Sequence, residues 1–427
     1  MQIDVTLDYS DYMYNFIKET IERFGPRNPC SSAEKKAAHF VKEELGKHCD
    51  EVSMETFTCV PRGLFLWIPV AITCILCSFL CFLIIYLVQP HRLIQVVVMA
   101  GAVGLVIVAF LVTWNQFFNY REFLDRFFKK RESQNVIGTF KASGEKKKII
   151  IFSAHLDSAF EFTLSRISEN FQRVVVFLGF GILMAWFCLS IAILTLTIFS
   201  LVPPGVFTTV LVLFFIGIPV MGFLSFFIMP GERANVVPGA IDDLSGVSVV
   251  MGLSKYLHER RDLIPSNVEI RLIAFGCEEA GLRGAYRYAA LHDNELKQLD
   301  AEVINMDGLE LGTKYHVIEF EPTTRTRHSK EVVEKLLNAA AAAGVNAHRF
   351  GAGKLERTLG FASGGSDAAA FSKAGIKAAS IISRNVVRST HFYHLRYDTI
   401  DNVDHSAMAG ALKTCLAFLQ NEACKQA

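Results

Sequence analysis

KIIIFSAHLDS, residues 148–158, is the stretch that decides the fold class of this chain of 427 residues. Its apolar, β-branched first half is typical of a strand that is buried on both faces of a sheet. Similar runs stand at residues 268–275, 301–305 and 378–383. Helical stretches precede and separate these runs, at residues 9–24, 32–48, 246–259, 284–291 and 329–343. Strands that alternate with helices predict an α/β fold, in which helices sandwich a mostly parallel sheet.

Polar side chains that can bind metal gather where these strands end. In such a sheet, ligands bind beyond the carboxyl ends of the strands, so these side chains are expected to share one edge. A further pair of acids lies in the turn GAIDDLSG, which opens the helix at 246–259. In chain order the candidates are His155, Asp157, Asp242, Asp243, Glu278, Glu279, Asp307, His394 and Asp398.

Each candidate, taken singly, has an ordinary structural alternative: a hydrogen-bonded loop pair, a helix cap or a solvent-exposed pair. Taken together, the candidates suit two divalent ions, because ions about 3.5–4 Å apart need a shared carboxylate and further N and O ligands. Two histidines with several carboxylates are a donor set that suits zinc. Without a metal, so many acids at one edge would raise one another's pKa values.

Four apolar blocks indicate membrane helices. Residues 64–88, 93–113, 174–202 and 206–229 contain no charged side chain. A bilayer core about 30 Å thick needs about 20 apolar residues in a helix, so each block is long enough to span it. Because only residues 89–92 and 203–205 join the blocks within each pair, we expect two tight hairpins that cross a lipid bilayer. No span holds an ionisable residue, which argues against a transporter or a proton pump.

The hairpins interrupt the α/β domain. The predicted layout is three pieces of the α/β domain at 1–62, 117–172 and 230–427, with the transmembrane hairpins at 63–116 and 173–229. Lys and Arg flank the spans on the domain side, whereas Arg92 alone lies on the other side. The positive-inside rule therefore predicts a multi-pass membrane protein whose large domain faces the cytoplasm. The net charge of +1 and the lack of a basic stripe give no indication of nucleic acid binding.

Residues 117–131, FFNYREFLDRFFKKR, place aromatic side chains on one helical face and charges on the other. Two interpretations stand side by side. This stretch is either a helix that lies along the membrane interface, or an ordinary amphipathic helix that docks on the domain.

The cysteines show no framework spacing, which suits a reducing compartment. Cys74, Cys77, Cys81 and Cys188 lie inside the apolar blocks, where cysteine behaves as a small apolar residue. The other six are scattered along the chain: Cys30, Cys49, Cys59, Cys277, Cys415 and Cys424.

Five motifs carry a resemblance to a known family: SAHLDS, GAIDDLSG, FGCEEAGLRGA, NMDG and YHLRYDTIDNV, in this order. The chain resembles the two-zinc aminopeptidases of metallopeptidase family twenty-eight, and the similarity extends over nearly all of the sequence outside the apolar blocks. The resemblance implies the zinc aminopeptidase fold, two zinc ions as cofactors and a peptide substrate. It implies an enzyme that hydrolyses N-terminal residues from peptides with a zinc-activated water.

The resemblance also implies roles for single residues. One zinc would be held by His155, Asp242 and Asp307, and the other by Asp242, Glu279 and His394, so that Asp242 bridges them. Glu278 would be the general base and Asp157 would orient His155. Tyr393 would stabilise the oxyanion, with a packing aromatic as the alternative. The peptide bond between Asp242 and Asp243 would be cis.

The sequence departs from the family pattern near the expected substrate pocket, at Leu156, Gly308 and Ala368. These departures concern substrate specificity more than the chemistry. Three alternatives stay open: glutaminyl cyclisation, which Asp243 disfavours, a carboxypeptidase, and a membrane receptor or scaffold without catalysis. No pattern in the sequence indicates an oligomeric state.

Overall fold

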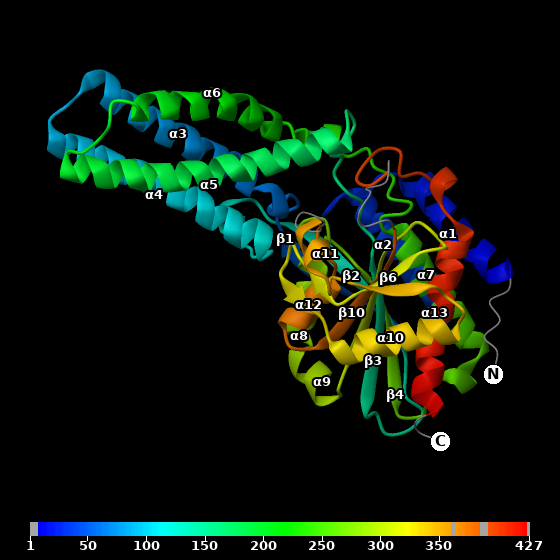
Figure 1. The fold of residues 1–427 in the computed structure, drawn as a ribbon. Coiled ribbons are helices and arrows are strands. Elements are labelled where there is room, and N and C mark those ends of the chain that lie inside the picture. The colour runs from blue at the N-terminus through cyan, green and yellow to red at the C-terminus, as the bar shows by residue number, and fades with distance from the viewer. Residues whose placement is uncertain (1–6, 360–363, 385–391, 425–427) are drawn as a thin grey trace. The chain divides into compact units, whose positions relative to one another are not determined.

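The computed structural model describes residues 7–359, 364–384 and 392–424 (Figure 1). The chain forms two compact units. The first, which we call the sheet unit, comprises Met1–Arg62, Lys129–Glu161 and Glu232–Ala427. The second, the helix unit, comprises Gly63–Phe128 and Phe162–Gly231.

The sheet unit is built on an eight-stranded sheet of order β1-β2-β4-β3-β5-β10-β6-β9. Four adjacent strands, β4, β3, β5 and β10, run parallel. On one side β2 pairs antiparallel with β4, and on the other side β6 pairs antiparallel with β10. At the edges, β1 is antiparallel to β2 and β9 is parallel to β6. The strands are β1 (Glu51–Cys59), β2 (Arg131–Phe140), β3 (Lys148–His155), β4 (Val268–Phe275), β5 (Glu302–Leu309), β6 (Tyr315–Ile318), β9 (Ala347–Phe350) and β10 (Lys377–Ser383). A separate two-stranded sheet pairs β7 (Phe320–Glu321) with β8 (Thr326–Arg327). The predicted α/β class is confirmed, with a mixed sheet whose centre is parallel.

Helices cover both faces of this sheet (Figure 1). One face packs α1 (Leu7–Phe24), α2 (Ser32–Gly46), α7 (Leu244–Glu259), α10 (Lys330–Ala342) and α13 (His405–Cys424). The other face packs α8 (Arg283–Leu291), α9 (Asp293–Gln298) and α12 (Ala368–Lys373). Strand β3 shows how one sequence fills two cores. Ile150 and Phe152 belong to the first core, and Ile149 and Ile151 to the second, because successive strand residues point to opposite faces.

The helix unit contains four helices that are long and apolar enough to cross a membrane. They are α3 (Trp67–Val88), α4 (Arg92–Val112), α5 (Glu169–Phe199) and α6 (Val206–Ser225). Between α3 and α5, the Trp186 Nε1–H donates to Ser78 Oγ at 3.0 Å and Phe79 stacks on the indole. Large apolar side chains such as Leu87 and Phe215 point outward with 69% exposure each. This unit therefore presents an apolar surface of the kind that soluble proteins avoid.

The helix predicted over residues 117–131 is wrong in both of its interpretations. The chain instead ends α4 in a π-helical turn, Thr113–Phe118, and a 3₁₀ turn follows at Asp125–Phe127 before β2 begins. Hydrogen bonds of Gln116 explain why the helix does not continue through residues 117–131. Its side-chain amide donates to Gly63 O at 2.6 Å and to Asp125 Oδ1 at 2.7 Å, and it accepts from the Leu124 N–H at 3.0 Å. These bonds fold the segment back on itself.

Candidate metal centre

The predicted site residues come together at the carboxyl ends of the parallel strands. His155 is the last residue of β3, Asp307 lies near the end of β5, and Glu278 and Glu279 follow β4. Asp242 lies just before α7, and the loop before α13 contributes His394. All of these side chains are buried, with exposures of 8% or less. Their nitrogen and oxygen ligand atoms form three groups, each with all atoms within 4.8 Å: His155–Asp242–Asp307, Asp242–Glu279–His394 and His155–Glu278–Glu279.

Asp242 is the common member of two of these groups. Its Oδ1 lies 3.1 Å from His155 Nε2, and its Oδ2 lies 3.4 Å from His394 Nε2. The same His394 nitrogen lies 3.3 Å from Glu279 Oε1. Each carboxylate oxygen of Asp242 therefore faces a different histidine, which is the arrangement that a carboxylate shared by two ions requires.

Asp243 ties together the segments that carry the ligands. Its Oδ1 accepts hydrogen bonds from the backbone N–H groups of Gly246 and Gly308, both at 3.1 Å. Its Oδ2 accepts from the backbone N–H of His155 at 3.1 Å. One carboxylate thus caps α7 and joins it to the ends of β3 and β5. The peptide bond between Asp242 and Asp243 is cis, as the resemblance implied.

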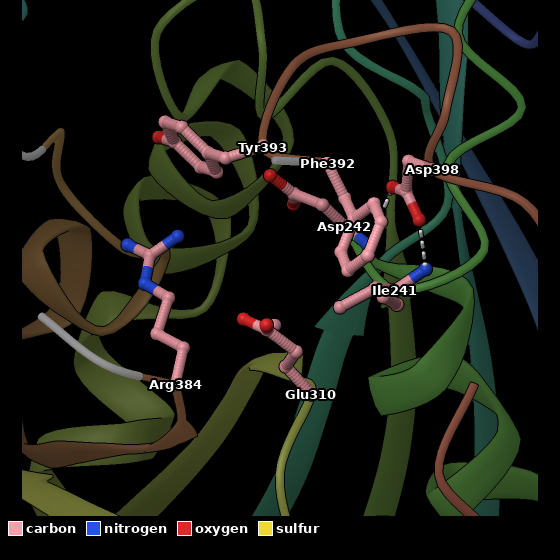
Figure 2. A pocket seen from close by; sticks show the side chains of 8 residues that line it. Ile241, Asp242, Glu310, Arg384, Phe392, Tyr393 and Asp398 are labelled. Carbon is pink, nitrogen blue, oxygen red and sulfur yellow. Dashed lines mark hydrogen bonds between the residues drawn. The ribbon is translucent and has the colours of Figure 1, made fainter. Parts of the chain in front are cut away.

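Two further carboxylates hold loop backbones in place. Asp398 accepts from the backbone N–H groups of Ile241 at 2.7 Å and Asp242 at 3.0 Å (Figure 2). Asp157 accepts from those of Glu278 and Glu279, both at 3.0 Å. The backbone oxygen of Asp157 lies 3.0 Å from His155 Nδ1, nearer than its carboxylate oxygen at 3.7 Å. Asp157 therefore contacts the imidazole through its backbone and the loop after β4 through its side chain.

Burial dominates the electrostatics of this site. It raises the pKa of Glu278 well above its usual range, and it raises the pKa of Asp307 to about 6. Burial also acts to raise the pKa of Asp242, but hydrogen bonds with His155 and His394 outweigh it and leave that pKa below its ordinary value. Closely packed buried acids are unfavourable unless a positive charge stabilises them. The donors, two imidazoles and several carboxylates, fit zinc.

A pocket opens beside Asp242 and contains residues that the sequence analysis did not single out. Figure 2 shows Arg384 and Glu310 on one side of it and Asp398 on the other. The Arg384 guanidinium lies 4.6 Å from the centroid of the Tyr393 ring. Arg384 directly follows β10 and Glu310 directly follows β5, so the rule that selected Asp307 would have found both. The lining residues are Ile241, Asp242, Gly308, Glu310, Arg384, Phe392, Tyr393 and Asp398.

Comparisons with known proteins show a family and several proteins to which this chain is similar. The model of peptidase family M28 matches residues 227–419. Aminopeptidase YwaD from Bacillus subtilis is 32% identical over 187 residues, which is 42% of this chain. The matched segment spans only 37% of that relative's length.

Solved structures share the fold. BSAP, a zinc aminopeptidase from Bacillus subtilis, matches with a TM-score of 0.53 and 17% identity, over 97% of this chain and 95% of its own. Fimbriiglobus ruber glutaminyl cyclase matches with a TM-score of 0.54 and 12% identity, over 98% of this chain and 96% of its own. These findings agree with the resemblance that the motifs indicated: over residues 227–419, the chain is similar to peptidase family M28.

Proposed function

We propose that this chain is a membrane-embedded, two-zinc aminopeptidase that removes N-terminal residues from peptides. The observation that carries the proposal is the position of Asp242, whose two oxygens face His155 and His394 separately at 3.1 and 3.4 Å. The similarity of residues 227–419 to peptidase family M28 and the fold shared with a zinc aminopeptidase support it. When bound, zinc ions lower the pKa of coordinated water and polarise the scissile carbonyl.

The site residues have separate roles in this proposed reaction. His155 and Asp307 complete one ligand set with Asp242, and Glu279 and His394 complete the other. Glu278 takes the proton from the attacking water and returns it to the leaving amine. Its burial supports this role, because a raised pKa brings a carboxylate nearer to neutral pH, where a general base exchanges protons most efficiently. Asp157, which holds the backbone of Glu278, keeps this base in place.

The pocket beside Asp242 carries groups that distinguish the two ends of a peptide. Glu310 supplies a carboxylate that complements a free amino terminus, and Tyr393 supplies a hydroxyl for the developing oxyanion. Arg384 favours a second candidate, a carboxypeptidase, because a guanidinium is the side chain best suited to bind a carboxylate. The accepted terminus is therefore the first property to measure.

We further propose that the four long helices cross the bilayer as two hairpins, with the sheet unit in the cytoplasm. Their length and composition support the spans, and the Lys and Arg residues near their ends support the orientation. A reporter enzyme inserted at residues 203–205 should lie outside the cytoplasm, whereas one inserted at residue 144 should remain inside. A cytoplasmic readout from both positions would contradict this topology.

The decisive experiment compares the purified full chain with its Glu278→Gln variant on four peptide substrates. These have free or acetylated N-termini and free or amidated C-termini. We expect turnover of peptides with a free N-terminus only, lost with a chelator and with Glu278→Gln. Glu145→Gln is the matched control, because Glu145 is exposed and outside the site.

Other outcomes choose among the alternatives. A requirement for a free C-terminus would identify the carboxypeptidase. Full zinc loading without turnover of any of the four peptides would contradict a peptidase and favour another reaction at the same centre. A chain that purifies without stoichiometric zinc and without turnover would be a receptor or scaffold.

A further inference from the structure

A second group of metal-competent side chains lies within the sheet unit, outside the centre described above. It consists of Cys30, in the loop before α2, Cys59, the last residue of β1, and Cys277, in the loop after β4. The Cys30 Sγ lies 3.4 Å from the Cys59 Sγ and 3.5 Å from the Cys277 Sγ, and all three atoms lie within 4.8 Å of one another. Cys59 and Cys277 are fully buried, whereas Cys30 is partly exposed.

This triangle of sulfur atoms fits a coordination shell better than a disulfide. In a tetrahedral site with zinc–sulfur bonds of about 2.3 Å, neighbouring sulfurs are about 3.8 Å apart. The observed separations need to open by only a few tenths of an ångström to reach that value. A disulfide would use two of the thiols and leave the third without a role, although Cys30 is almost equally close to both others.

We propose that Cys30, Cys59 and Cys277 bind one thiophilic cation, zinc or copper(I), at a site separate from the N and O centre. Thiolates select these ions, whereas magnesium, calcium and manganese prefer oxygen ligands. The proposal does not depend on peptidase activity, since none of its three ligands belongs to the proposed catalytic set.

A buried carboxylate fixes the backbone around this site. Glu34, fully buried, accepts from the backbone N–H of Cys30 at 2.7 Å and from that of Cys277 at 3.1 Å. The hydroxyl of Ser133 donates to the same side chain at 2.9 Å. Hydrogen bonds of this kind behind the ligands are what orients a metal site, and the partly exposed Cys30 offers the cation a way in.

Cys277 connects the cysteine cluster to the loop that carries Glu278. Cys277 directly precedes Glu278 and has a φ of 57°, in the left-handed region that non-glycine residues seldom adopt. A cation bound here ties the start of α2 and the end of β1 to the loop that carries Glu278. We infer that it is a structural ion that keeps this loop in its strained conformation.

Cobalt(II) provides the test, because cobalt–thiolate bonds give intense near-ultraviolet charge-transfer absorption, which a centre with only N and O ligands lacks. The purified full chain is stripped of metal and titrated with cobalt(II). We expect the near-ultraviolet band to appear in the wild type and to be lost in both Cys59→Ser and Cys30→Ser. The band should persist in the control Cys49→Ser, whose cysteine lies outside the cluster.

Metal analysis of the purified proteins completes the test. The wild type should hold one more ion per chain than Cys59→Ser, and its identity separates zinc from copper. Cys30→Ser is the second variant because it replaces the least buried ligand and perturbs folding least. A wild type without the near-ultraviolet band, equal metal content in wild type and variants, or a disulfide between two of the three cysteines would each overturn the proposal.

Discussion

The two ends of the parallel strands hold buried acids in opposite circumstances. At the amino ends, Glu302 is fully buried and pairs with Lys148 at 2.9 Å and with Lys335. At the carboxyl ends, the acids of the candidate metal centre face the imidazoles of His155 and His394. In the described part of the chain, none of these acids has a Lys or Arg ion-pair partner within 4.0 Å.

This difference indicates that the amino ends of the strands contribute to stability and the carboxyl ends to metal binding. A buried carboxylate is unfavourable unless it is paired. At the amino ends, lysine side chains supply the pairing charge, so that end is stable without a bound ion. At the carboxyl ends, Arg384 acts to lower the pKa of Asp307, but no Lys or Arg among the described residues pairs with these acids within 4.0 Å. Burial there raises the pKa of Glu278 and Asp307. The missing positive charge is what a bound metal would provide. The comparison therefore predicts that acids at the two ends respond differently to substitution.

The largest effect is expected on turnover at the carboxyl ends. Glu278→Gln removes the proton acceptor and should lower kcat by about 10²–10⁴-fold, the usual contribution of a general base. Its unfolding free energy and zinc content should change little, because Glu278 is not among the proposed ligands. Steady-state kinetics with metal analysis checks both. A variant with full activity would remove Glu278 from the mechanism.

At the amino ends the same kind of substitution should act on stability. Glu302→Gln leaves Lys148 and Lys335 with only Glu422 as a shared buried partner, at 2.7 and 3.4 Å. Breaking a buried pair costs about 3–5 kcal/mol, and Glu422 should keep the loss near the lower end of that range. Urea denaturation measures it, and kcat of the folded variant should stay unchanged. A loss of kcat without a loss of stability would contradict the division between the two ends.

Metal removal should destabilise the sheet unit through the carboxyl ends alone. A ligand at 100 times its Kd stabilises a protein by about 2.7 kcal/mol, so chelation should lower the unfolding free energy by a similar amount. In a Cys59→Ser background, which lacks the proposed cysteine site, Asp242→Asn removes the shared carboxylate and should abolish most of that response, whereas Glu302→Gln should retain it. Thermal unfolding with and without chelator measures this loss of stability in each variant. An equal response in both variants would mean that the centre holds no stabilising ion.

The smallest effect concerns pH and a separate, partly exposed group of ion pairs, those of Glu295 with Lys146 and Arg271. Burial acts to raise the pKa of Glu295, but hydrogen bonds with Lys146 and Arg271 outweigh it and lower this pKa from 4.5 to about 2. Because the folded-state pKa is lowered, this stabilisation is present above about pH 4.5 and is lost as the pH falls towards 2. Glu295→Gln should flatten the acid side of the stability profile slightly. An unchanged profile would show that solvent screens these pairs fully.

Local patterns predicted most of the central fold. The runs that became β3, β4, β5 and β10 are apolar and β-branched because both faces of these strands are covered, so their composition reveals them. Strand β1 was not predicted, because it lies at the sheet edge and most of its residues are exposed or partly exposed, many of them polar. The turn around Gln116 was also missed, because the aromatic pattern of residues 117–131 suits a helix, and only side-chain hydrogen bonds break it.

By itself, the sequence determined the strand runs, the four long apolar helices and the ordered motifs that contain the candidate metal ligands, because composition and spacing are local properties. The tertiary structure alone decided that Asp243 and Asp398 hold the ligand loops. It also decided that Cys30, Cys59 and Cys277 meet, although 29 residues separate the first two and 247 separate the outer two. No local preference links residues so far apart. The order of the strands in the sheet brings them together, because β2 lies between β1 and β4 and places the ends of those strands beside the loop before α2.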